Sequence, residues 1–380
     1  MKRVGIDIGS TAVRCVEVDG IDRNGYAKVT KIGVVPLANS AMDAGRIRNP
    51  LTVAQAVLRA LKAGGMSGYG AVIGIASPQT ALARVEVPSA VKPDERIGVV
   101  RNGRKEVAAT VPLAESALSI SAIGPGTSLE GAPITNIVAS VALHEAVGAV
   151  LEVCQLSKVS PRALDHQAAA LTRALIRAPL SNTDVHTIVD IGDTKTIVTT
   201  RHGLDLRSMR TIPIGGASIT RAIERAAQLN HKDAEAMKRT MRLSSSSRNP
   251  APMDAQSGYG ASDIEVERET PQNETLVEEA LTASANSLVD QIAQTVEADA
   301  SQYGMTQGVT IVGGGSQLLG LRERLATRIG VPVIHGDPWA QVVPNRHTER
   351  FLNAQGQVDP VFLMSLTTAN GLAIWEKSNV

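Results

Sequence analysis

One short pattern, Asp-Ile-Gly-x-Thr, occurs twice in this chain, at residues 7–11 and again at residues 190–194. An apolar run of the kind that forms buried strands precedes each copy, and the glycine then permits a tight turn. Each copy therefore predicts a strand that ends in a glycine turn. A chain that repeats one such unit is expected to fold as two lobes with a cleft between them.

The predicted elements around the two copies repeat as well. Two strands, a helix and a further strand follow each copy in the same order. After the first copy they are expected at residues 12–18, 27–37, 51–63 and 71–77, and after the second at 196–201, 204–213, 217–229 and 309–312. The duplication therefore extends beyond the glycine turns.

Two segments interrupt this repeat. Residues 82–160 alternate strand and helix patterns and predict a compact α+β insertion in the first lobe, while residues 243–273 are rich in Ser, Pro, Gly and Gln and predict a disordered surface loop. A helix is expected over residues 165–176, another over 274–303 and a third over 318–330. The predicted division is a first-lobe core of 1–81, 161–183 and 366–380, an inserted subdomain of 82–160, a second-lobe core of 184–222 and 307–365, and a second-lobe insertion of 223–306.

Composition excludes several classes of protein. The chain has 380 residues and a formal net charge of +1, and only 2% of its residues are aromatic. A nucleic-acid binder would need a basic face and stacking platforms, so nucleic acid is not an expected partner. No apolar stretch approaches the roughly 20 residues that span a bilayer, so we expect a soluble, cytoplasmic protein without direct membrane insertion. Its two cysteines, Cys15 and Cys154, lack metal-site spacing and are expected to be buried thiols.

The two glycine turns are the first candidates for chemistry. Successive backbone N–H groups in such turns form a small anion-binding nest, and hydroxyls add further donors. Two turns from two lobes would grip a phosphate chain from both sides, and carboxylates at the strand ends would be tolerated with hydrated magnesium between them. The candidate phosphate ligands are Gly9, Ser10, Thr11, Gly192, Asp193 and Thr194, and the candidate metal ligands are Asp7 and Asp190. An ordinary tight turn is the alternative for either copy alone, and Asp193 would repel phosphate unless it points away or pairs with Lys195.

Two further glycine pairs or runs stand where a strand leads into a helix. Gly313, Gly314, Gly315 and Ser316 follow the strand at 309–312, and Gly215 and Gly216 precede the helix at 217–229. Such junctions let a flat ligand lie against the backbone near a helix N-terminus, although a flexible start to a helix explains them equally well.

The order of these motifs resembles the two phosphate motifs and the adenosine motif of the actin/Hsp70/sugar-kinase ATPase superfamily. More narrowly, the chain is similar to the PilM family of type IV pilus assembly, a relative of FtsA. The likeness covers most of the chain outside 243–273, and its most specific segments are residues 4–14, 87–95, 213–223 and 313–321. The fold that it implies is α/β and actin-like, with duplicated ribonuclease-H-like lobes and an α+β insertion in the first.

This resemblance implies ATP and Mg²⁺ in the cleft. It also implies that the first lobe, near the inserted subdomain, docks the short N-terminal cytoplasmic peptide of a PilN-like inner-membrane protein, which would hold the chain at the inner face of the plasma membrane. Contact with pilus motor ATPases is left open.

The chain departs from the family at the residue that orients the attacking water. Gln167 stands where PilM proteins usually carry glutamate; it can orient water but cannot act as a strong base. Asp165 is a substitute candidate, and capping of a helix is its alternative role. We therefore expect slow ATP hydrolysis at most.

Two other functions stay open. An FtsA-like division protein that polymerises at the membrane would need a basic amphipathic C-terminal helix, and none is predicted here. A small-molecule kinase would need an acidic base beside a polar pocket, for which Asp165 is the one candidate.

Overall fold

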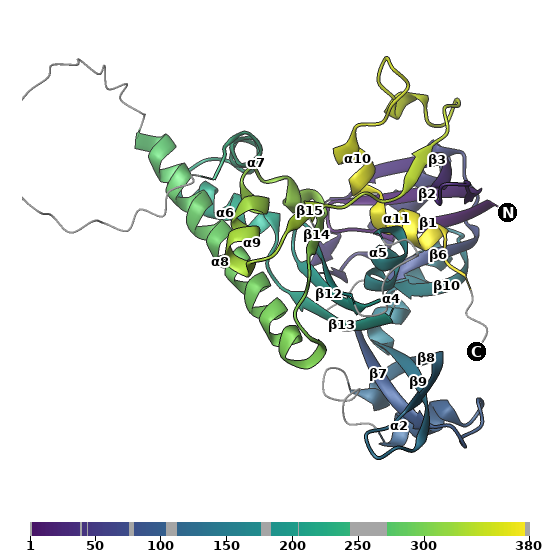
Figure 1. The fold of residues 1–380 in the computed structure, drawn as a ribbon. Coiled ribbons are helices and arrows are strands. Elements are labelled where there is room, and N and C mark those ends of the chain that lie inside the picture. Colours follow the sequence, from purple (N-terminus) through teal and green to yellow (C-terminus); the bar gives the residue numbers. More distant parts are fainter. Residues whose placement is uncertain are drawn as a thin grey trace, which may run out of the picture.

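The fold is described from a computed structural model that covers residues 2–38, 40–43, 45–75, 80–103, 112–175, 184–203, 205–243 and 272–376. Two mixed β-sheets form two lobes, and a third, three-stranded sheet projects from the first lobe (Figure 1). The predicted loop at 243–273 lies almost wholly outside the described residues, as do the ends of the predicted elements at 71–77 and 94–109.

The sheet of the first lobe has the strand order β10-β6-β1-β2-β3-β16. β1 and β2 are antiparallel, as are β2 and β3. The parallel pairs are β6 with β1, β10 with β6 and β16 with β3. Apolar residues of β1 are buried along nearly its whole length, as expected for a central strand covered on both faces. The strands are β1 (Lys2–Ile8), β2 (Ala12–Ile21), β3 (Ala27–Pro36), β6 (Tyr69–Ile75), β10 (Ser160–His166) and β16 (Ala340–Val342).

The sheet of the second lobe repeats this arrangement. Its order, β13-β12-β11-β14-β15, matches β3-β2-β1-β6-β10 of the first sheet strand for strand and direction for direction. The strands are β11 (Val185–Ile191), β12 (Thr196–His202), β13 (Asp205–Ile212), β14 (Val309–Val312) and β15 (Val333–His335). The predicted duplication is therefore present at the level of topology.

Helices cover both sheets. In the first lobe the apolar faces of α1 and α4 pack on the sheet in one buried cluster, and α5 and α11 pack together on β1 and its neighbours. In the second lobe α6, α8 and α9 share one apolar core with the sheet, and α8 runs along the outside of that lobe (Figure 1). The helices are α1 (Pro50–Gly64), α4 (His144–Leu156), α5 (Gln167–Leu175), α6 (Gly216–Ala227), α7 (His231–Thr240), α8 (Gln272–Tyr303), α9 (Leu321–Ile329), α10 (Pro360–Ser365) and α11 (Thr367–Ala373).

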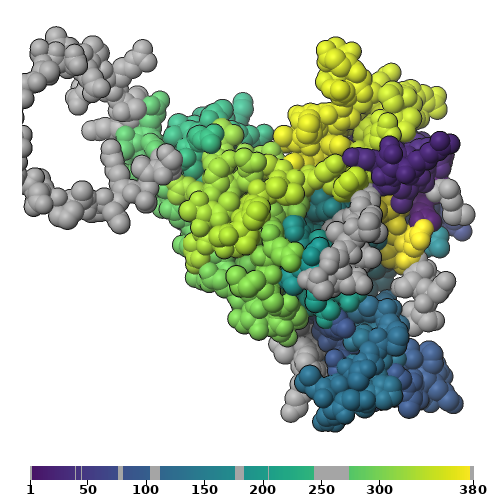
Figure 2. All heavy atoms as spheres, viewed as in Figure 1, coloured from purple at the N-terminus to yellow at the C-terminus, as the bar shows by residue number. Residues whose placement is uncertain are grey.

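The inserted subdomain has its own core. β9 lies between β7 and β8, and α2 packs on this sheet. In Figure 2 the subdomain, coloured blue, forms the lower part of the molecule. Its elements are β7 (Thr80–Pro88), α2 (Arg96–Gly103), β8 (Ser116–Thr127) and β9 (Pro133–Leu143).

Three boundaries differ from the sequence-based expectation. α4 was expected within the insertion, but its buried face packs on α1 in the first lobe. The segment at 340–342 was expected in the second lobe, but it pairs with β3 in the first sheet. The helix expected from residue 165 begins at Gln167, because residues 160–166 form β10 instead. The rest of the domain division stays a prediction.

Candidate functional site

The two Asp-Ile-Gly-x-Thr turns have the same backbone hydrogen bond. In the first, the N–H of Gly9 donates to the carbonyl oxygen of Ala12 at 3.0 Å. In the second, the N–H of Gly192 donates to the carbonyl oxygen of Lys195 at 2.9 Å. Both turns therefore join two adjacent antiparallel strands, β1 to β2 and β11 to β12, with the same hydrogen bond.

The two turns meet at the junction of the lobes. The hydroxyl oxygens of Ser10 and Thr194 lie 2.7 Å apart, within hydrogen-bond distance. The turn at 9–11 and the turn at 192–194 are thus brought together at Ser10 and Thr194.

Asp7 lies buried at the end of β1, beside this contact. Its Oδ1 accepts a hydrogen bond of 2.8 Å from Nε2 of Gln167, and its Oδ2 lies 4.0 Å from Nη1 of Arg14. Burial raises the pKa of the Asp7 carboxyl, and the charges of Arg14 and Lys195 and the Gln167 hydrogen bond oppose that rise. The negative charge of the Asp7 carboxylate is therefore countered at one oxygen by the Gln167 amide and at the other by the Arg14 guanidinium.

Asp190 occupies the equivalent place in the second lobe. Burial, and then the nearby charge of Asp7, raise its pKa to about 6, while Lys195 and Arg14 act in the other direction. Burial lowers the pKa of Lys195 to about 8, although both carboxylates favour its charged form. Charges from both lobes thus act on one another across the junction.

Gly215 and Gly216 position the second turn. A Cβ at Gly215 would lie 2.5 Å from the carbonyl oxygen of Gly192 and 2.6 Å from that of Asp193, so a larger residue would displace the turn. The N–H groups of Gly216 and Ala217 donate to these two carbonyls at 2.9 and 2.8 Å. The first turn of α6 therefore uses these amides to hold the loop and does not present them to a ligand.

The glycine run after β14 packs against the end of β11. Gly313 has φ +85, and a Cβ there would lie 2.3 Å from Oδ1 of Asp190; a Cβ at Gly315 would lie 2.4 Å from Cγ2 of Ile191. A Cβ at Gly314, by contrast, would meet nothing within 4 Å. Ser316 is buried, and its hydroxyl donates to the carbonyl of Gly313 at 2.7 Å. The run therefore closes one side of the site, with Gly314 facing open space.

The two candidate catalytic residues lie in different settings. Gln167 begins α5 and reaches Asp7, as described above. Asp165 lies in β10, two strands from Asp7, and its carboxylate accepts the N–H of His166 at 2.9 Å and pairs with the Arg173 guanidinium. Asp165 is therefore engaged by Arg173 and is not gathered into the cluster around Asp7.

Sequence reasoning gave no role to two charged residues of this region, Arg14 and Lys238, and considered Lys195 only as a possible partner of Asp193. Arg14 and Lys195 are described above. The ammonium of Lys238, in α7, donates to the carbonyl of Gly216 at 3.2 Å and to the Thr220 hydroxyl at 2.9 Å. Burial raises the pKa of the Asp193 carboxyl, and of the charges that oppose this rise Lys238 has the largest effect. The local sequence around Lys238 indicates a helix, because Asn230 is a residue type that caps helices and its side chain does cap the start of α7.

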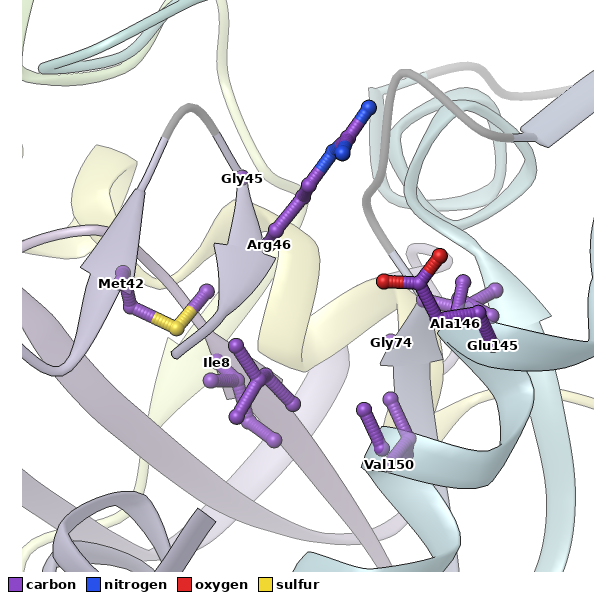
Figure 3. Close-up of a pocket in the computed structure, with 11 residues that line it drawn as sticks. Ile8, Met42, Gly45, Arg46, Gly74, Glu145, Ala146 and Val150 are labelled. Atoms are coloured by element: carbon purple, nitrogen blue, oxygen red, sulfur yellow. The ribbon is translucent and has the colours of Figure 1, made fainter. Parts of the chain in front are cut away.

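A second candidate site is a cavity between the first sheet and α4 (Figure 3). It encloses about 450 Å³, including its open mouth, and its floor is apolar. Arg46 and Glu145 stand on opposite sides of the opening (Figure 3). The lining residues are Ile8, Met42, Gly45, Arg46, Ile47, Gly74, Ile75, Glu145, Ala146, Ala149 and Val150.

Comparison with known proteins decides the family. The sequence model described as type IV pilus assembly protein PilM matches residues 5–250, which is more than half of the chain. The chain belongs to the PilM family. A model of the cell division protein FtsA also matches this PilM-family chain, over residues 187–356. The predicted family is thereby confirmed.

Solved structures confirm the fold. A PilM–PilN type IV pilus biogenesis complex is similar with a TM-score of 0.75 at 22% identity, covering 98% of both chains. The ethanolamine utilization protein EutJ from Carboxydothermus hydrogenoformans has a TM-score of 0.52 at 15% identity, covering 99% of this chain and 90% of that one. MreB5 of Spiroplasma citri bound to ADP has a TM-score of 0.50 at 12% identity, covering 99% and 96%. The fold is the predicted actin-like one.

Within the described residues, two negative findings bear on function. None of the described helices is long and apolar enough to cross a membrane. The same part of the chain holds no group of three or more His, Cys, Asp or Glu side chains that could bind a metal ion.

Proposed function

We propose that this PilM-family protein binds ATP between its two glycine turns and acts as a nucleotide-dependent scaffold in pilus assembly. The observation that carries the proposal is the contact of Ser10 with Thr194 at the junction of two equivalent turns. A polyphosphate chain would replace this hydroxyl contact and receive both hydroxyls as donors.

The polar atoms at the junction suit an anion. Among the described residues, nothing accepts the backbone N–H of Ser10, Thr11, Asp193 or Thr194. Nε of Arg14 is buried and also has no partner in the described part of the chain. A buried donor without an acceptor costs about 1–3 kcal/mol, which a phosphate oxygen would offset. The donor set therefore fits a phosphate chain.

The nucleoside would lie on the side of the second lobe. Gly314 leaves the backbone open there, and Lys238 with its partner Glu235 borders the start of α6. Magnesium stays a proposal: Asp7 and Asp190 would reach the ion through its bound waters, as hydrated Mg²⁺ permits.

Hydrolysis of ATP would be slow. Gln167 is the polar side chain that touches Asp7, and an amide orients water without accepting its proton. The carboxylate that could serve as a base, Asp165, is paired with Arg173. The protein would then act through ATP binding, which sets the arrangement of the two lobes, and not through ATP turnover.

We further propose that the cavity beside α4 docks the N-terminal peptide of a PilN-like membrane protein. A solved relative is a PilM–PilN complex, which supports a partner of this kind. An apolar floor with Arg46 and Glu145 at the rim suits a peptide that inserts an apolar side chain and carries charges of both signs. Such docking would hold the protein at the inner face of the membrane.

Nucleotide binding is tested by calorimetry and thermal melting with ATP. Asp7→Ala and Gly9→Val should abolish the ATP-dependent rise in Tm that the unmodified protein gives. Asp43→Asn, at an exposed carboxylate of the same lobe, is the matched control and should retain the rise. Equal stabilisation of all four proteins would refute the site.

Peptide docking is tested by titrating the labelled N-terminal peptide of the PilN-like partner. Ala149→Trp would fill the cavity and should weaken binding at least about tenfold, equivalent to 1.4 kcal/mol. Glu152→Ala, on the exposed face of the same helix, is the control. Tight binding to Ala149→Trp would place the peptide elsewhere.

An FtsA-like assembly is the second candidate, because the FtsA model matches the second lobe. ATP-dependent pelleting of the protein on liposomes without any partner would favour it over the scaffold.

A further inference from the structure

The two lobes also meet in a buried apolar cluster. Its buried members come from both lobes and are Leu171, Ile188, Val312 and Met364. Met364 lies in α10, and two other residues of this short helix, Phe362 and Leu363, pack against the apolar cluster of the first sheet. α10 therefore packs on the first lobe, and Met364 is the residue through which it reaches the second (Figure 1).

The sulfur of Met364 accepts a hydrogen bond from the second lobe. Nε2 of Gln317 lies 3.3 Å from Sδ of Met364 and 3.1 Å from Oγ of Ser316. A side-chain amide nitrogen carries two hydrogens, so it can donate to both atoms at once. The Ser316 hydroxyl donates in turn to the carbonyl oxygen of Gly313 at 2.7 Å. A chain of hydrogen bonds thus runs from a helix on the first lobe to the backbone of the glycine run at 313–315.

The glycine run depends on such a chain for its position. Three successive glycines have no side chains of their own, and glycine has the greatest backbone freedom of all residues. Gly314 is exposed, and a Cβ there would meet nothing within 4 Å. The two residues that follow the run, Ser316 and Gln317, are those whose side chains lie next to the sulfur of Met364. Loss of the sulfur would leave the Gln317 amide without this acceptor and would loosen the run.

We infer that Met364 is a positioning residue for the nucleotide: through Gln317 and Ser316, its sulfur holds the glycine run in the place against which the nucleoside lies. The inference rests on the proposed binding of ATP, with the nucleoside on the side of the second lobe. Met364 acts through the run and not by touching the ligand. ATP affinity should therefore depend on a hydrogen-bond acceptor at this position of α10.

Two substitutions separate the sulfur as an acceptor from the side chain as packing. Met364→Leu keeps the apolar volume and removes the acceptor, so ATP affinity in calorimetric titration should fall about fivefold, while urea denaturation shows only a small loss of stability. Met364→Gln has nearly the same length and keeps an acceptor, but it buries an amide in an apolar cluster. It should lose more stability than Met364→Leu and yet bind ATP within about twofold of the unmodified protein. A purely structural role predicts the reverse order of affinities.

A double-variant cycle tests whether Met364 and Gln317 act through one contact. Gln317→Leu removes the donor and should weaken ATP binding about fivefold, and adding Met364→Leu to it should weaken binding no further. Met66→Leu, at a partly buried methionine of the first-lobe core, is the matched control and should bind ATP as the unmodified protein does. This cycle decides the question even if Met364→Gln fails to fold.

The results that would overturn the inference differ from those that would remove the proposed function. Unchanged ATP affinity in Met364→Leu, affinities that follow stability in the two Met364 variants, or additive losses in the double variant would each overturn the inference and leave ATP binding standing. Absence of ATP binding by the unmodified protein would remove the proposed function, and the inference with it.

Discussion

The hydroxyl of Ser10 lies 2.7 Å from the hydroxyl of Thr194, although 184 positions separate the two residues in the chain. Each belongs to a glycine turn at the end of a central strand, and the two strands belong to different sheets. The contact therefore joins the two lobes through their equivalent glycine turns.

Removal of this contact should reveal whether a ligand takes its place. Ser10→Ala and Thr194→Ala should each lower the free energy of unfolding by about 1 kcal/mol, and the double variant should lose less than the sum. With saturating ATP the coupling between the two sites should vanish, because the phosphates would receive both hydroxyls. Urea denaturation of the four proteins, with and without ATP, measures this.

A second hydroxyl pair serves as the control for that cycle. Thr187 and Thr306 lie 3.2 Å apart, buried within the second lobe. Their coupling should be the same with and without ATP. If the Ser10–Thr194 coupling also persists in ATP, the nucleotide does not enter between the turns.

Neighbouring glycines of one run should respond differently to alanine. Gly313→Ala places a methyl group 2.3 Å from Oδ1 of Asp190 at a positive φ, and should cost at least about 2 kcal/mol of stability. Gly314→Ala meets nothing and should change stability by under about 1 kcal/mol, yet lower ATP affinity if the nucleoside lies there. Thermal melting and ATP titration separate the two effects; equal stability losses would contradict the geometry.

Asp190→Asn should stabilise the protein in a pH-dependent way. The folded state raises the pKa of this carboxyl from 3.8 to about 6, so the folded protein holds a proton that the unfolded chain has released between these values. The group therefore costs stability as pH rises from 4 to 6, and the full cost, up to about 3 kcal/mol, remains above pH 6.

The gain of Asp190→Asn over the unmodified protein should accordingly grow between pH 4 and pH 6 and then level off. Urea midpoints at pH 4, 5, 6 and 7 measure it. Asp43→Asn, at an exposed ion pair with Arg48, should show no such trend. A gain independent of pH would mean that charge burial is not its cause.

An ion pair connects the inserted subdomain to the second lobe. Nη1 of Arg84 in β7 lies 3.4 Å from Oδ2 of Asp205 in β13, and Arg84 also donates to Asn136 of the insertion. Arg84→Ala should lower global stability by only about 1 kcal/mol but accelerate amide exchange in β7 and β13. Hydrogen-exchange mass spectrometry measures this.

Arg96→Ala is the matched control for that experiment, because Arg96 bonds to Val91 within the insertion. It should leave exchange in β13 unchanged. Unchanged exchange in Arg84→Ala as well would mean that the pair does not restrain the subdomain.

Local sequence was sufficient for the duplicated core of this protein. Apolar runs that end in Asp-Ile-Gly predicted β1 and β11 and the turns after them, since burial of a strand and the φ freedom of glycine depend on adjacent residues. The fold class and the family followed from the order of these motifs.

Only the tertiary structure decided which charges meet. Asp165 was predicted in a helix, but its partners on β6 make it part of a strand, and Arg173 engages its carboxylate. The strand at 340–342 joins the first sheet by pairing with β3, which lies some three hundred residues earlier in the chain. Lys195 follows the second turn in the sequence, yet the carboxylate of Asp7 in the other lobe, as well as that of Asp190, favours its charged form. Hydrophobic periodicity and turn conformation depend on neighbouring residues. Strand pairing and electrostatic coupling depend on segments that only folding brings together.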